Sequence, residues 1–265
     1  MSLLTIENLS IATPQTTLVS GVNLTIAPGE RVGLIGESGS GKSLTAMAAT
    51  GLLAPGITAK GSVILGDTQV IGASERKLNT LRGRVAAFVF QEPLTALDPL
   101  MRVDRQIAEP IQRHAPHRLS REALHAAVLK LMHDVALPDP DRIARAYPHE
   151  ISGGQRQRVA IAMALACEPA LLIADEPTTA LDVTTQAEIL ALLDRLVRER
   201  NMALLFISHD LPVVATIVDR VVVLRHGEIV ETGPIAGVFG APQHDYTKSL
   251  VSAAHAFDAA LGGAP

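Results

Sequence analysis

Short apolar runs alternate along the chain with stretches in which apolar residues return every three or four positions. The runs predict strands at residues 3–9, 22–26, 32–35, 85–90, 171–174, 204–208 and 221–224. The longer spacing predicts helices at residues 42–53, 156–166, 184–200 and 211–218. Because strands and helices alternate, we expect an α/β fold with a mainly parallel sheet covered on both faces.

Residues 93–147 differ from the rest of the chain because helical spacing dominates there. Ser120 is placed to cap a helix whose apolar residues recur at three- and four-residue spacing. Pro138 and Pro140 are expected to close that helix. We therefore expect a helical insertion within the α/β fold.

Composition narrows the class of protein. The chain has 265 residues, of which 48% are hydrophobic and 19% charged, which is typical of a globule with one large core and an inserted subdomain. Lys and Arg total 23 against 27 Asp and Glu, so nucleic acid is not the expected partner. The single cysteine, Cys167, excludes an internal disulfide and an iron–sulfur cluster. The first basic residue is Arg31, so we expect no secretory signal and a cytoplasmic location.

A phosphate-binding loop follows the strand predicted at residues 32–35. The segment fits the pattern G-x-x-x-x-G-K-S and consists of Gly36, Glu37, Ser38, Gly39, Ser40, Gly41, Lys42 and Ser43. Glycines let backbone amides surround phosphate oxygens, the lysine reaches the β and γ phosphates, and the last serine offers a hydroxyl to Mg²⁺. The alternative is a glycine-rich turn, but the flanking strand and helix favour nucleotide binding.

Two carboxylates end the strand predicted at residues 171–174. Successive side chains of a strand point to opposite faces, so Asp175 and Glu176 are expected to have different roles. Asp175 suits the Mg²⁺ shell, whereas Glu176 suits the water that attacks the γ phosphate. Two solvated acids at a strand end are the alternative.

His209 follows a third apolar strand, at the edge where open α/β sheets bind ligands. We expect its ring to contact the γ phosphate or the attacking water. A solvated histidine is the alternative, because the signal is a single residue.

A second anion site is predicted at the start of the helix at residues 156–166. Ser152, Gly153, Gly154 and Gln155 place a hydroxyl and glycine amides at a helix N-terminus. Helix capping alone would also explain the serine.

The segment 151–158, followed by Asp175 and Glu176, resembles the signature motif of ATP-binding cassette (ABC) ATPases. The resemblance covers nearly the whole chain. The family's glutamine is matched by Gln91, its aspartate loop by Ala180, Leu181 and Asp182, and its switch histidine by His209. It implies ATP and Mg²⁺ as cofactors, with Ser43, Gln91 and Asp175 toward the metal and Gln91, Glu176 and His209 toward catalysis.

The resemblance also implies the architecture. We expect a P-loop NTPase (RecA-like) core with an N-terminal antiparallel β subdomain and an inserted helical subdomain. The expected core comprises residues 1–92 and 157–240, the helical signature subdomain residues 93–156, and a short tail residues 241–265. Two cassettes are expected to pack head to tail, with each ATP between the phosphate loop of one and the signature loop and Asp182 of the other.

Within the family, segments 90–103, 147–150 and 175–183 look most like the dipeptide, oligopeptide and nickel importer branch. This implies a peripheral subunit at the cytoplasmic face of the inner membrane, with a second and different cassette chain, two permease subunits and, indirectly, a solute-binding protein. Peptides, nickel or another small polar solute stay open as cargo. The tail after residue 250 lacks the cysteines that hold an iron–sulfur cluster in some peptide importers.

Adenine recognition departs from the family pattern. The family usually stacks adenine on an aromatic side chain ahead of the phosphate loop, but residues 11–15 are aliphatic or polar. Either the base is unstacked, or an aliphatic face formed by residues such as Ile11 or Val19 covers it.

Two other functions compete with the importer. A cassette of a soluble complex resembling carbon–phosphorus lyase would share these motifs. A DNA-repair or chromosome ATPase is disfavoured, because segment 93–147 has neither heptads nor cysteines.

Overall fold

A computed structural model describes residues 2–92, 96–179 and 181–262. The chain forms two compact units, one from residues 1–78 and 203–265 and the other from residues 79–202. The first unit therefore joins the N-terminal and C-terminal parts of the chain. The predicted boundaries between core, helical subdomain and tail lie at other positions and stay a prediction.

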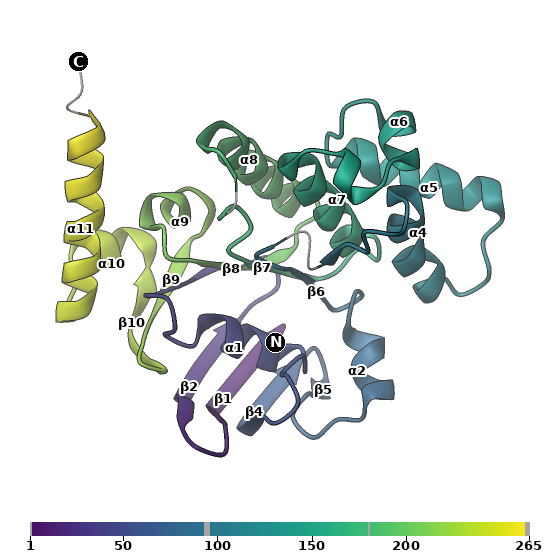
Figure 1. Cartoon of the computed structure of the whole chain (residues 1–265). Helices are drawn as coiled ribbons and strands as arrows, with labels where there is room; N and C mark the ends of the chain where they lie inside the picture. The colour runs from purple at the N-terminus through teal and green to yellow at the C-terminus, as the bar shows by residue number, and fades with distance from the viewer. Residues whose placement is uncertain (1, 93–95, 180, 263–265) are drawn as a thin grey trace. The chain divides into compact units, whose positions relative to one another are not determined.

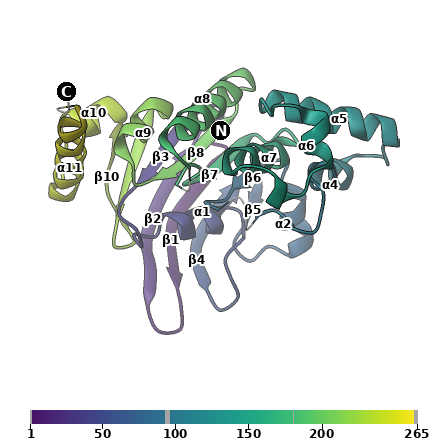
Figure 2. The same cartoon turned by 45° about the horizontal axis from the view of Figure 1, so that its top comes forward.

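An antiparallel sheet begins the first unit. Its strands are β1 (Leu4–Ala12), β2 (Thr17–Ile26), β4 (Thr58–Leu65) and β5 (Thr68–Gln69), in the order β2-β1-β4-β5. Leu4 of β1 pairs with Ile26 of β2 and with Leu65 of β4, and all three side chains are buried. The three long strands lie side by side in Figure 2. Their alternation of buried and exposed residues gives the sheet one apolar face.

A second group of strands in the first unit carries the phosphate loop. Here β10 (Glu228–Pro234), β9 (Arg220–Arg225), β3 (Arg31–Ile35) and β8 (Ala203–Ser208) are neighbours in that order. Strand β3 runs parallel to β8 and β9, and β10 is antiparallel to β9. Fully buried residues such as Leu34 and Phe206 fill these strands. The carboxyl ends of β3 and β8 consequently share one edge.

The helices of the first unit connect or follow these strands. They are α1 (Lys42–Ala49), α9 (Leu211–Ile217), α10 (Ile235–Gly240) and α11 (Asp245–Gly262), and α11 lies beside α10 in Figure 1. Helix α2 (Glu75–Leu81) spans the boundary between the units.

The second unit combines two parallel strands with a group of helices. Strands β6 (Ala86–Val89) and β7 (Leu171–Asp175) pair in parallel. The helices are α4 (Val103–His114), α5 (Arg121–Asp134), α6 (Pro140–Arg145), α7 (Gly153–Leu165) and α8 (Val183–Glu199), with a 3-10 turn at Pro148–Glu150. Helices α4 to α7 gather together in both views (Figures 1 and 2). The predicted helical insertion corresponds to this group.

Some predicted boundaries are wrong for identifiable reasons. The helix predicted at residues 42–53 ends at Ala49, because Gly51 adopts a left-handed conformation with φ 67° and turns the chain. Pro140 begins α6 instead of closing α5, since proline fits the first turn of a helix. Strand β2 starts at Thr17 and is longer than predicted, because its polar residues alternate outward. Helix α4 was missed, and Pro110 within it disrupts the helical signal.

Candidate nucleotide-binding site

The phosphate loop joins β3 to α1, as the motif requires. Gly36 directly follows β3 and has φ 151°. A Cβ built there would lie 2.1 Å from the carbonyl oxygen of Leu224 in β9. Gly41 precedes α1 with φ 100°, and its Cβ would lie 2.8 Å from Cγ2 of Val19 in β2. Both glycines are therefore required by close packing as well as by conformation. The loop is a cradle that side chains at these positions would fill.

The polar groups of the loop suit an anion. The buried Lys42 donates from Nζ to the carbonyl oxygens of Gly36 and Glu37, both at 2.8 Å. Ser40 is 5% exposed, and its Oγ finds no hydrogen-bond partner within the described part of the chain. A buried hydroxyl without a partner is costly, so a phosphate oxygen would complete this site. The loop residues fit a nucleotide phosphate.

Two distant segments bond to the loop backbone. The Gly227 amide, between β9 and β10, donates to the Ser40 carbonyl oxygen at 3.0 Å. The Glu37 amide donates to the Tyr246 hydroxyl at the start of α11, at 2.8 Å. Sequence reasoning missed both residues, because no motif spacing connects position 37 with position 246.

His209 lies in the same unit, directly after β8. Its side chain is exposed, and the preceding Ser208 accepts a bond from the Asp210 amide at 3.0 Å. Asp210 in turn caps α9 by accepting from the Val213 amide. His209 thus lies between a buried strand and a capped helix, and these two elements hold its backbone in place.

The paired carboxylates lie in the second unit, at the end of β7. Asp175 is buried as the last residue of the strand. Glu176 adopts a left-handed conformation with φ 45°, which is uncommon for a residue with a side chain and often marks a functional site. Its Oε2 accepts from Gln91 Nε2 at 3.1 Å and from Thr179 Oγ1 at 3.0 Å. The structure therefore brings together the predicted glutamine and the predicted base, which are 85 residues apart.

The predicted second anion site forms a capping box. Ser152 Oγ accepts from the Gln155 amide at 3.3 Å, and Gln155 Oε1 accepts from the Ser152 amide at 3.1 Å. Gly154 packs against α8, where its Cβ would lie 2.6 Å from Cγ2 of Thr185. Capping therefore accounts for the bonds of Ser152, while Ser152 and Gly153 stay exposed.

Asp182 joins this cluster as the N-cap of α8. It accepts from the Thr185 amide at 3.0 Å and from the Thr185 hydroxyl at 2.7 Å, and these bonds lower the pKa of its carboxyl. The capped carboxylate is thus ionised and fixed beside the signature loop. Ala180, the first residue of the predicted aspartate loop, lies outside the described residues, as does Pro93 after Gln91.

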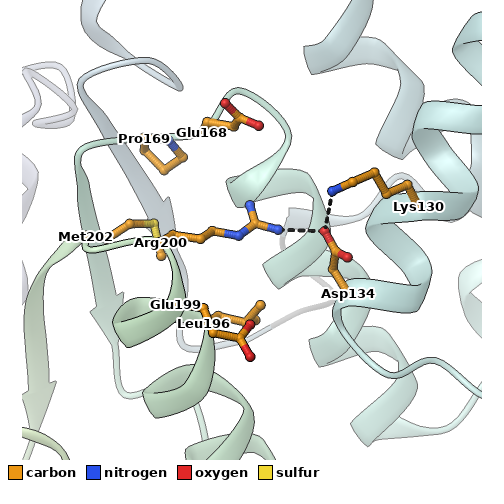
Figure 3. A pocket seen from close by; sticks show the side chains of 8 residues that line it. All are labelled: Lys130, Asp134, Glu168, Pro169, Leu196, Glu199, Arg200 and Met202. Atoms are coloured by element: carbon orange, nitrogen blue, oxygen red, sulfur yellow. Dashed lines mark hydrogen bonds and ion pairs between the residues drawn. The ribbon is translucent and has the colours of Figure 1, made fainter.

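The second unit also contains a charged pocket that none of the predicted site residues lines (Figure 3). Asp134 of α5 accepts from Lys130 at 3.0 Å and from Arg200 at 2.7 Å. Glu168 and Glu199 add two further carboxylates to its wall. Lys130 and Arg200 both pair with Asp134 inside this pocket. The bond from Arg200 joins α5 to the end of α8. Within the described part of the chain, no helix is both long and apolar enough to cross a membrane.

Comparison with known proteins assigns the family. The family profile described as "ABC transporter" matches residues 19–179. The chain belongs to the ABC transporter family. Within it, the chain is similar to ATP-binding proteins named for the import of peptides and of glutathione. The predicted family is confirmed.

Two relatives illustrate the similarity. A glutathione import ATP-binding protein of Pectobacterium atrosepticum is 45% identical over 268 residues, covering 97% of this chain and 43% of the relative. A protein of Brucella melitensis biotype 1, named for peptide import ATP binding, is 50% identical over 240 residues, covering 88% and 70%. The chain therefore spans less than half the length of the glutathione relative. Both relatives are named for import, not for a soluble enzyme complex.

Solved structures confirm the fold class. A dimeric ATP-binding cassette in a post-hydrolysis state, bound to ADP and Pi, is 30% identical with a TM-score of 0.78, covering 88% of this chain and 98% of that one. The cbiO1 protein of Clostridium perfringens, part of an ABC transporter complex, is 25% identical with a TM-score of 0.77, covering 97% and 99%. The predicted α/β cassette architecture thus has close counterparts.

Proposed function

We propose that the chain binds Mg²⁺-ATP and hydrolyses it as the ATP-binding subunit of an importer for peptides or a related small polar solute. The observation that carries the proposal is the phosphate loop between β3 and α1. A Cβ at Gly36 or Gly41 would meet neighbouring strands too closely, and the buried Ser40 hydroxyl has no hydrogen-bond partner within the described residues. These features suit the phosphates of a nucleotide.

Polar groups of the phosphate loop bond to one another in this structure, and the same groups would bind the nucleotide. Lys42 would exchange its two carbonyl partners for oxygens of the β and γ phosphates, which a positive charge prefers. The N-terminus of α1 adds its dipole. Ser43 is the first residue after this lysine and would offer its hydroxyl to Mg²⁺.

The carboxylates of the second unit would perform the hydrolysis. Asp175 and the Gln91 amide supply oxygen ligands of the kind that Mg²⁺ prefers, and the metal would neutralise charge on the phosphates. Glu176 would accept a proton from the attacking water, whose oxygen forms a bond to the γ phosphorus as the bond from that phosphorus to the leaving ADP oxygen breaks. The Gln91 and Thr179 bonds orient Glu176 for this role. His209 would donate a hydrogen bond to the γ phosphate.

The exposed surface near the signature loop supports a dimer. Ser152, Gly153 and Asp182 are exposed, and Val183 beside them is 84% exposed, which is unusual for a valine. A head-to-tail partner cassette would cover this surface and place the two loops against its own ATP. The resemblance to the dipeptide, oligopeptide and nickel importer branch favours a different cassette chain as that partner.

A second exposed surface supports docking to a permease. Leu100 is 87% exposed just before α4, and Arg102 lies over the Tyr147 ring at 5.9 Å. Leu97 is close to Leu100 in the sequence, but its side chain is only 4% exposed and packs inside. We propose that two permease subunits dock here, at the cytoplasmic face of the inner membrane, with a solute-binding protein as an indirect partner.

The test is ATP binding by the full chain with and without the loop lysine. Lys42→Ala should weaken Mg²⁺-ATP binding by at least about tenfold in calorimetry, because a charge-assisted contact to the phosphates is lost. Lys60→Ala is the matched control, since Lys60 is an exposed lysine of β4 in the same unit. Equal affinities of the Lys42 variant and the wild type would refute the proposed site.

A further inference from the structure

A tyrosine side chain from the C-terminal part of the first unit reaches the phosphate loop. Tyr246, in the first turn of α11, is only 5% exposed, and its hydroxyl accepts the Glu37 amide at 2.8 Å. The two residues are 209 positions apart. None of the predicted site residues lies in the segment around Tyr246. This bond connects that segment to the loop that would hold the nucleotide.

Tyr246 is itself held in place from several directions. The Arg225 guanidinium lies over its ring at 4.9 Å from the centroid, a cation–π contact. Its amide donates to His244 Nδ1 at 3.1 Å. The carboxylate of Glu231, in β10, accepts the amides of Gln243 at 2.9 Å and His244 at 3.0 Å. The segment before α11 is therefore fastened to the sheet, and the hydroxyl has a defined position.

The residue that Tyr246 binds also determines where Lys42 lies. The carbonyl oxygen of Glu37 accepts from Lys42 Nζ at 2.8 Å and from the Ser40 amide at 3.2 Å. Glu37 is thus fixed at its amide by Tyr246 and at its carbonyl by two loop residues. Without the hydroxyl, the amide side would lose its partner and the loop would sample more conformations.

The protonation state of Tyr246 suits a position beside phosphates. Burial raises the pKa of its hydroxyl above the usual value, and this outweighs the opposing bond from the Glu37 amide. The group therefore stays neutral at physiological pH. An ionised phenolate would repel the nucleotide, whereas the neutral hydroxyl accepts a bond without adding charge.

We propose that Tyr246 is a positioning residue for the phosphate loop, which makes the segment from Gln243 to Tyr246 part of the nucleotide-binding apparatus. The inference rests on the proposed function of that loop. Preorganisation lowers the cost of binding, so its loss reduces affinity without altering the chemistry of the bound state. Tyr246 should therefore affect the affinity for ATP and leave the turnover rate at saturating ATP unchanged.

The experiment compares Tyr246→Phe with Ser249→Ala in the full-length protein. The first variant removes the hydroxyl and keeps the ring over Arg225, and the second removes an exposed hydroxyl of α11 that donates to Asp245. We expect Tyr246→Phe to weaken Mg²⁺-ATP binding about three- to tenfold, as the loss of one neutral hydrogen bond allows. Ser249→Ala should bind like the wild type. In the assembled complex, KM for ATP should rise and kcat should stay constant.

Hydrogen exchange supplies a readout that a general loss of stability would not move. Tyr246→Phe should speed amide exchange within residues 36–42 and leave the antiparallel sheet unchanged. Unchanged exchange in the loop together with unchanged ATP affinity would overturn the inference. A fall in kcat at saturating ATP would also overturn it, because the hydroxyl would then act in the chemical step.

Two controls keep the inference separate from the proposed function. If Lys42→Ala binds ATP normally, the phosphate-loop proposal fails; if it binds poorly while Tyr246→Phe binds normally, only the role of Tyr246 fails. Should the phenylalanine variant not fold, exchange of the Glu37 amide in the nucleotide-free wild type decides. Protection of that amide relative to its exposed neighbour Ser38 is expected, and equal exchange would contradict the bond.

Discussion

Replacing the first glycine of the phosphate loop by alanine tests the packing of the site. In Gly36→Ala, the new Cβ would lie 2.1 Å from the Leu224 carbonyl oxygen. This is more than 1 Å short of the ~3.3 Å at which carbon and carbonyl oxygen ordinarily meet. Leu224 cannot move away easily, because β9 is held between β3 and β10. The clash must therefore be relieved by the loop.

Gly39→Ala is the matched control within the same loop. Gly39 has φ 79°, so an alanine there is also strained, but its Cβ would meet no atom within 4 Å. A left-handed residue costs roughly 1–2 kcal/mol. The overpacking at Gly36 adds about 1–3 kcal/mol to such strain. Both variants carry backbone strain, so a larger loss of stability in Gly36→Ala is the effect expected from close packing.

Thermal unfolding of the two variants measures that difference. With about 2–4 °C of midpoint shift per kcal/mol for a chain of this size, Gly36→Ala should melt at least about 2 °C below Gly39→Ala. It should also bind Mg²⁺-ATP more weakly, because the displaced loop carries Ser40. If the two variants melt together and bind ATP equally, the close approach of Gly36 to β9 does not constrain the loop.

Three further predictions concern adenine, docking and the helical group. Thr13→Tyr should tighten ATP binding about five- to 150-fold and favour ATP over GTP in competition assays, because Ile11 and Val19 are fully buried and offer no face to a base; unchanged affinity would show that the base is already packed. A cysteine at Leu100 should crosslink to a permease in the assembled complex, whereas one at the buried Leu97 should react poorly; crosslinks from Leu100 to the second cassette alone would contradict the docking assignment. Ser120→Ala should lower the free energy of unfolding by about 1 kcal/mol in denaturant titrations, because the cap of α5 is lost; no change would mean that the cap is replaced.

The candidate site was predictable from sequence wherever the chemistry lies in a short segment. Gly36, Gly41 and Lys42 follow one motif, and their spacing alone predicts a loop between a strand and a helix. Glu176 was predicted from its place at the end of an apolar strand. Its left-handed backbone was not predicted, because no glycine or asparagine signals it.

Contacts between distant segments could not be predicted in the same way. The order of motifs suggested that Gln91 and Glu176 act at one site, but only the folded chain shows the bond between them. Tyr246 belongs to no motif that joins it to Glu37, since hydrogen bonds across 209 residues leave no periodicity in the sequence. Hydrophobic character alone also does not distinguish the exposed Leu100 from the buried Leu97, because it does not separate a docking surface from a core.

The rate of phosphate release from Mg²⁺-ATP by the assembled complex tests the central claim most directly. Glu176→Gln keeps a carbonyl oxygen that accepts from Gln91 and Thr179, so the resting geometry should survive. Glu199→Gln is the control, since Glu199 is an exposed carboxylate of the same unit that pairs with Arg195. We predict that Glu176→Gln binds ATP like the wild type and hydrolyses it at least about a hundredfold more slowly, while the control is unaffected. Near-normal hydrolysis by Glu176→Gln would contradict the assignment of Glu176 as the general base.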